Sequence, residues 1–98
     1  MLWVKKYVRA GDVVLAVADE ELMGREFEEN ELVLRVGSFY RGELVREEQV
    51  KSILRDATII NAVGERAVQA LIEAGLAVPG AEKRVQGVPH LQVVLYFR

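Results

Sequence analysis

The sequence predicts one α+β domain, residues 1–98, with two helices packed on one face of a sheet. The sheet is antiparallel or mixed, has about five strands, and belongs to a β-β-β-α-α-β-β element order. Short runs rich in valine and aromatic residues, bounded by glycine turns, predict strands near both ends of the chain. Two stretches with apolar residues at helical spacing lie between them. Ninety-eight residues is close to the most common domain size, so we expect one core.

The first two strands are predicted as a hairpin of residues 2–9 and 13–18, because Gly11 and Asp12 supply the turn chemistry. The second strand is apolar on both faces, which predicts a central position in the sheet. Side chains alternate between the faces of a strand. One face of the first strand therefore alternates aromatic and basic residues: Trp3, Lys5, Tyr7 and Arg9.

A polar connection follows, with a short helical turn expected at residues 20–23 and a third strand at 32–36. Residues 39–43 are expected to form a loop.

The first helix is predicted at residues 46–57, where apolar residues form one continuous stripe. The second is predicted from residue 62 to about 74, after a turn at 58–61. Asn61 is its expected N-cap, and Gly75 its expected C-terminal stop.

The chain is predicted to return to the sheet with a short strand at 84–86, a turn at 87–89 and a last strand at about 91–97. These two strands complete the predicted order.

Composition excludes several kinds of site. The chain has no cysteine and a single histidine, which excludes disulfides, thiolate metal centres and multi-histidine metal sites, and no cofactor is indicated. Its apolar runs are too short for a membrane span and no secretory signal is present, so we expect a cytoplasmic protein without membrane partners. The preference for Glu and Arg over thermolabile residues is typical of thermophile proteins.

Charge is divided unevenly along the chain. Residues 1–49 contain seven Lys or Arg and eleven Asp or Glu, whereas residues 50–98 contain six and four. Duplex DNA binders need a broad cationic surface, so duplex DNA is not an expected partner.

The densest acidic run lies at residues 19–31. Asp19, Glu20 and Glu21 are weak candidate ligands for magnesium, and a solvated loop explains the same residues. The run also allows a protein–protein adaptor, with a possible homodimer formed through exposed strand edges.

Three residues near the second helix are further candidates. Gly64 is costly inside a helix, which indicates either close approach of the backbone to a group such as a phosphate or close packing of the two helices. Arg66 lies beside it. His90 is either a general acid–base group or a hydrogen-bonded structural residue. If the predicted helix start and the turn at 87–92 are neighbours, they form a second patch of Asn61, Gly64, Arg66, His90 and Gln92.

Five phrases in order resemble the archaeal family called domain of unknown function 424. They are A-D-E-E-L-M-G at 18–24, F-E-E at 27–29, F-Y-R-G-E at 39–43, N-A-V-G-E-R-A-V at 61–68 and G-V-P-H-L-Q at 87–92. Ala18 stands where that family often has cysteine, which argues against a thiol activity there. The resemblance implies an archaeal cytoplasmic α+β protein with no established activity, and an association with translation or RNA.

The resulting hypothesis is a non-catalytic binding module for RNA, or for an RNA-bound protein of the translation machinery. Single-stranded nucleic acid binds aromatic–basic surfaces by base stacking and phosphate neutralisation, although such residues also cover the wet face of many sheets. Tyr40 and Arg41 are expected to extend the surface of Trp3, Lys5, Tyr7 and Arg9. The rival is a hydrolase or transferase with Glu43, Glu65 and His90 as acid–base groups, which predicts one pocket that joins them.

Overall fold

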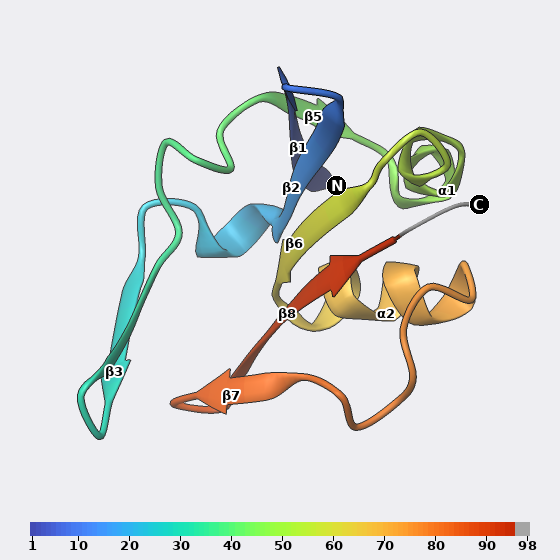
Figure 1. Cartoon of the computed structure of the whole chain (residues 1–98). Coiled ribbons are helices and arrows are strands. Elements are labelled where there is room, and N and C mark those ends of the chain that lie inside the picture. Colours follow the sequence, from blue (N-terminus) through green and yellow to red (C-terminus); the bar gives the residue numbers. More distant parts are fainter. Residues whose placement is uncertain (96–98) are drawn as a thin grey trace.

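The computed structural model describes residues 1–95, which form eight strands, two α-helices and one 3-10 turn (Figure 1). The strands are β1 (Leu2–Arg9), β2 (Asp12–Asp19), β3 (Glu26–Glu29), β4 (Leu32–Arg35), β5 (Glu43–Val45), β6 (Ile59–Val63), β7 (Lys83–Val85) and β8 (Val88–Val94). The helices are α1 (Glu47–Leu54) and α2 (Glu65–Glu73), and the 3-10 turn η1 is Glu20–Leu22. The predicted α+β class is confirmed.

Six strands form one mixed sheet in the order β5-β1-β2-β6-β8-β7. All neighbours are antiparallel except β2 and β6, which pair in parallel. Strands β3 and β4 form a separate two-stranded hairpin. No helix of the described residues is long and apolar enough to cross a membrane.

The predicted first hairpin is confirmed. Strands β1 and β2 pair from Leu2 with Asp19 to Arg9 with Asp12, and Ala10 and Gly11 make the turn with φ angles of 49° and 88°. Two consecutive residues with positive φ match the twist of the flanking strands. The apolar second strand is central, as expected, with β1 and β6 on either side.

The predicted helix start at residue 62 is wrong. Residues Ile59–Val63 form the central strand β6, so Asn61 is a strand residue and Gly64 occupies the N-cap position of α2. A five-residue apolar run cannot be assigned to helix or strand by periodicity alone, and the β-branched Ile59 and Ile60 favour a strand. The end of α2 agrees with the prediction, since Gly75 has a φ of 75° and Leu76 N donates to Leu71 O.

Three other elements differ from the prediction. Part of the predicted loop 39–43 begins strand β5, and the polar connection contains β3, whose Phe27 is buried between exposed glutamates. Helix α1 ends at Leu54, three residues early. The last strand begins at Val88 because the turn lies at Gln86 and Gly87, and the predicted residues 96 and 97 lie outside the described residues.

The sheet separates two apolar cores. On one face α1 and α2 cover a core that includes Leu15, Val17, Ile60 and Leu71 (Figure 1). On the other face η1, the β3–β4 hairpin and loop 37–42 cover a smaller core around Ala16 and Ala18. The prediction that both helices pack on one face is correct. We call the opposite side the helix-free face.

Candidate functional site

Helix α2 begins against a buried carboxylate from a distant strand. Asp19 is 4% exposed, and its two oxygens accept hydrogen bonds from the backbone amides of Arg66 at 3.2 Å and Ala67 at 2.8 Å. Gly64 has a φ of 107°, and a Cβ atom there would overlap the Asp19 carboxylate. Close approach of the backbone was one of two interpretations of Gly64, and not the favoured one; the structure shows such an approach, with Asp19 as the neighbour. Helix–helix packing and a bound phosphate are not its explanation.

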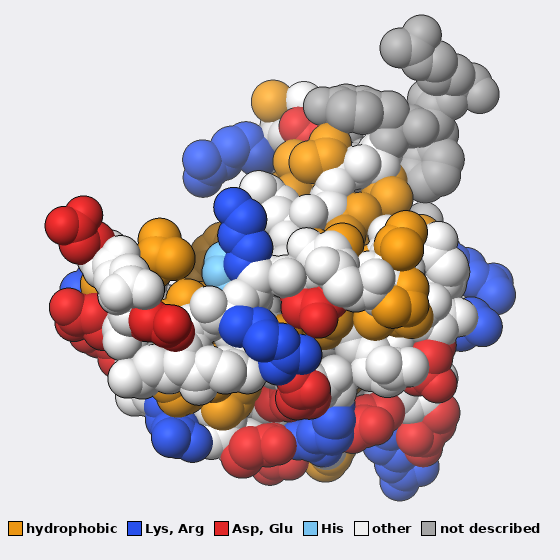
Figure 2. Space-filling view, turned by 90° about the horizontal axis from the view of Figure 1, so that it is seen from below, with side chains coloured by type: hydrophobic (Ala, Val, Ile, Leu, Met, Phe, Trp, Pro, Cys, Tyr) orange, Lys and Arg blue, Asp and Glu red, His pale blue; other side chains and the backbone are white. Residues whose placement is uncertain are grey.

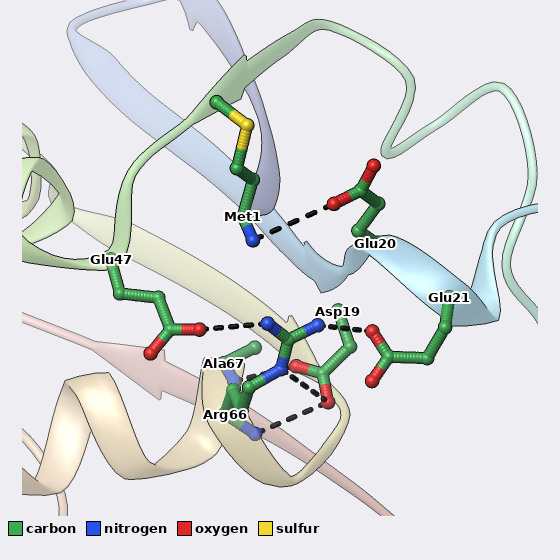
Figure 3. Close-up of polar contacts among 7 residues, drawn as sticks. All are labelled: Met1, Asp19, Glu20, Glu21, Glu47, Arg66 and Ala67. Carbon is green, nitrogen blue, oxygen red and sulfur yellow. Dashed lines mark hydrogen bonds and ion pairs between the residues drawn. The ribbon is translucent and has the colours of Figure 1, made fainter.

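Arg66 completes this cluster at the start of α2 (Figure 3). Its guanidinium pairs with Glu21, with Glu47 at 2.8 Å and with Asp19 at 4.0 Å. We call Asp19, Glu21, Glu47, Gly64 and Arg66 the capping cluster. Because its polar groups bind one another, Gly64 and Arg66 serve the fold here.

Burial and hydrogen bonds shift the ionisation of the capping cluster in opposite directions. It raises the pKa of Asp19, and the amides of Ala67 and Arg66 oppose that effect. Hydrogen bonding to its own backbone and the nearby Arg66 lower the pKa of the exposed Glu21. No group of three or more His, Asp or Glu side chains within residues 1–95 has a geometry that could hold a metal.

The aromatic–basic face of β1 lies under loop 37–42. The Tyr7 hydroxyl donates to Phe39 O at 2.7 Å, and the two rings stack with centroids 5.1 Å apart. Lys5 Nζ donates to Ser38 O at 3.2 Å. Trp3 is half-buried against the smaller core. Arg9 and Arg41 are exposed. Lys5 and Tyr7 of this predicted platform are therefore engaged within the chain, while Arg9 and Arg41 still face solvent.

A recess of about 400 Å³ opens on the helix-free face beyond this platform. Five of its lining residues carry polar groups: Tyr40, Asn61, Lys83, His90 and Gln92. Figure 2 shows the pale-blue histidine beside a blue Lys or Arg side chain. Four of the five were candidates from the sequence, drawn from both predicted patches.

Strand register explains why these residues meet. Asn61 of β6 is directly opposite Gln92 of β8, and His90 of β8 is directly opposite Lys83 of β7. His90 and Gln92 are two residues apart on one strand, so they share a face. On the neighbouring strand β2, Ala16 is opposite Asn61, and its small side chain leaves space beside Asn61.

The recess differs in charge and pairing from most of the surface. None of its lining residues is acidic, although the whole chain has 15 Asp and Glu against 13 Lys and Arg. Within residues 1–95, the side chains of its five polar residues form no hydrogen bond with the protein. Burial raises the pKa of Tyr40, which keeps its phenol a neutral donor. The recess therefore presents polar groups that are free to bind a ligand.

Lys83 is the recess residue that sequence reasoning missed. The predicted strand began at residue 84, and Lys83 reaches the recess only because β7 pairs with β8 from Lys83 opposite His90. The dipeptide Gln86-Gly87 was the available signal, since glycine after a polar residue is typical of a two-residue hairpin turn.

The structure does not bring together the three residues of the enzyme hypothesis. Glu43 is on edge strand β5 and His90 on β8, four strand spacings or roughly 19 Å apart. Glu65 is on α2, where it bonds Arg84 at 2.7 Å, and lines a different hollow from His90.

Comparisons with known proteins address the family. A search among curated proteins finds no match. The crystal structure of an uncharacterized conserved protein from Methanopyrus kandleri is similar, with a TM-score of 0.80 and 26% sequence identity over 99% of this chain and 95% of that chain. The model of the family described as "Protein of unknown function (DUF424)" matches residues 7–96. The chain thus belongs to the DUF424 family, as its five phrases indicate.

Proposed function

We propose that this protein is a non-catalytic binding module that contacts unpaired nucleotides of RNA through its helix-free face. The observation that carries the proposal is the recess, where five polar side chains without partners in the described chain converge and no lining residue is acidic. Binding sites are typically concave and contain a few convergent polar groups.

The cations near the recess suit an RNA backbone. Lys83 is exposed at the recess, and Lys5 lies on the same face of the sheet, in the row of Ala16, Asn61 and Gln92. Lys5 Nζ donates one hydrogen bond to Ser38 O. Because an ammonium group has three donors, two remain for a phosphate. Lys5 on β1 and Lys83 on β7 are four strand spacings or roughly 19 Å apart, so they can contact separate, non-adjacent phosphates of one single strand that crosses the face.

RNA of the translation machinery is the first ligand class to try, because the family resemblance implies it. The protein is titrated with bulk tRNA and ribosomal RNA at low and high salt, with the fluorescence of Trp3, its one tryptophan, as the signal. Saturable quenching that weakens with salt is expected, since phosphate binding releases counterions.

A matched pair of lysine variants locates the surface. Lys83→Ala should weaken binding and reduce the salt slope by roughly one half to one, whereas Lys51→Ala, on α1, should change neither. Equal effects of the two substitutions, or no saturable binding by the folded protein, would refute the proposal.

The β3–β4 hairpin favours a second candidate function, that of a protein adaptor. Leu32 is 55% exposed and Val33 47% exposed, beside the exposed Glu28, Glu29 and Glu31. Exposed apolar residues rimmed by charge are typical of protein interaction surfaces. We propose a basic protein as its partner. The double variant Leu32→Ser with Val33→Ser should abolish capture of such a partner and leave RNA affinity unchanged. If the double variant still captures the partner but loses RNA affinity, the hairpin is not the protein-binding surface.

A further inference from the structure

We infer that the recess binds a single nucleobase carried on a ribose phosphate, and that Asn61 and Gln92 contact the edge of that base. The inference rests on the proposed function for the source of the base, because a nucleotide in RNA and a free nucleotide offer the same chemistry. It adds that binding discriminates between bases.

The two amides occupy adjacent positions on one face. Residues directly opposite each other in an antiparallel pair have Cβ atoms roughly 5 Å apart, and Asn61 and Gln92 are such a pair. Each amide offers two donors and an acceptor, and neither is bonded to another described side chain. Bases present mixed donors and acceptors along an edge, which is the pattern that Asn and Gln match.

The other lining residues suit the rest of a nucleotide. Tyr40 lines the recess but is only 9% exposed, so it forms part of the recess wall and offers its phenol rather than an open stacking face. His90 can donate or accept a hydrogen bond, and Lys83 opposite it can neutralise a phosphate. None of these groups carries a negative charge, which would repel a phosphate.

Size and openness favour an unpaired base. The hollow of about 400 Å³ lies within the usual range for small-ligand sites. The pairing edges of a base within a duplex are occupied by its partner, whereas those of an unstacked base are free for amide contacts. The recess should therefore select single-stranded or splayed-out nucleotides.

Nuclear magnetic resonance of ¹⁵N-labelled protein tests the inference with free ligands. The four ribonucleoside 5′-monophosphates should shift the side-chain amide signals of Asn61 and Gln92 saturably, while ribose 5-phosphate should leave them in place. The amide of Gln69, on the exposed side of α2, is the internal control. Asn61→Ala and Gln92→Ala should each weaken nucleotide binding about 3- to 10-fold, and Gln69→Ala should not. Equal shifts with ribose 5-phosphate, or none with any nucleotide, overturn the inference.

Oligoribonucleotides separate this inference from the proposed function. The affinities of the four homopolymeric decamers should differ by at least about fivefold, and the chain with both Asn61→Ala and Gln92→Ala should bind them within about twofold. If decamers bind equally well and nucleotides do not bind, the recess inference fails and RNA binding stands. If nucleotides bind at the recess but no RNA does, the proposed function fails and the recess is a free-nucleotide site.

Discussion

Two clusters of polar side chains on this chain differ in what they bind. In the capping cluster, Asp19 accepts two backbone amides and Arg66 contacts three carboxylates. In the recess, Asn61, His90 and Gln92 have no side-chain hydrogen bonds within residues 1–95. Polar groups already bonded inside the protein stabilise its fold, whereas convergent unbonded groups are available to a ligand. Stability should therefore depend on the first cluster, and recognition on the second.

The largest effect on stability should come from Gly64→Ala. The new Cβ would overlap the Asp19 carboxylate and force a side chain into a φ of 107°. Strain and overpacking together should lower the free energy of unfolding by about 3–5 kcal/mol in urea denaturation. Gly80→Ala is the control, since its φ is 92° but nothing lies within 4 Å, and it should cost about 1 kcal/mol. Equal costs would mean that the close approach does not require glycine.

Asp19→Ala should have the next largest effect. It leaves the amides of Arg66 and Ala67 without their acceptor and removes one partner of Arg66, so the expected loss is about 2–4 kcal/mol of unfolding free energy. The exposed Asp56 is a matched control, and Asp56→Ala should change stability by less than about 0.5 kcal/mol. Gly64→Ala introduced into the Asp19→Ala chain should cost much less than in the parent, because the overlap is gone. If the losses of unfolding free energy caused by the two substitutions simply add, the new Cβ at position 64 does not overlap the Asp19 carboxylate.

The capping cluster should also make stability depend on pH. Burial raises the pKa of Asp19 above its ordinary value of 3.8, so the folded chain binds this proton more tightly than the unfolded chain. Its stabilising contribution is full below that value and is lost as pH rises through the folded pKa. Relative to Asp19→Asn, the parent should lose unfolding free energy as pH rises from about 3.8 through the higher pKa of the folded state.

Urea denaturation of both chains across this range measures the difference. Glu21 titrates in both, so its lowered pKa largely cancels. If the parent instead gains unfolding free energy relative to Asp19→Asn as pH rises, the amides of Arg66 and Ala67 outweigh burial and the pKa of Asp19 is lowered.

Local signals in the sequence predicted most of the elements. The hairpin of β1 and β2 follows from one turn and its flanking residues, and the stop at Gly75 from a single glycine. Strand β6 was missed because its five residues lie next to a helical pattern. Its identity depends on parallel pairing with β2, whose residues are more than 40 positions away in sequence, and no local pattern encodes that contact.

The candidate site was predicted in its residue types but not in its assembly. Asn61, His90 and Gln92 were expected to meet at a helix start, and they meet instead through the register of β6 and β8. Close approach at Gly64 was only one of two interpretations of the sequence, because its neighbour Asp19 is 45 residues away and only the tertiary fold pairs them. Composition and local pattern select candidate residues, and long-range pairing decides which of them share a site.

The smallest stability effect should come from the recess itself, with Gln92→Ala. Gln92 is exposed and its side chain has no hydrogen bond to residues 1–95, so its loss should change the free energy of unfolding by less than about 0.5 kcal/mol. Urea denaturation measures this beside Asp19→Ala under the same conditions. If Gln92→Ala destabilises as much as Asp19→Ala, the recess amides stabilise the fold and the contrast between the clusters fails. If stability is unchanged while nucleotide binding weakens, the polar groups of the recess serve recognition.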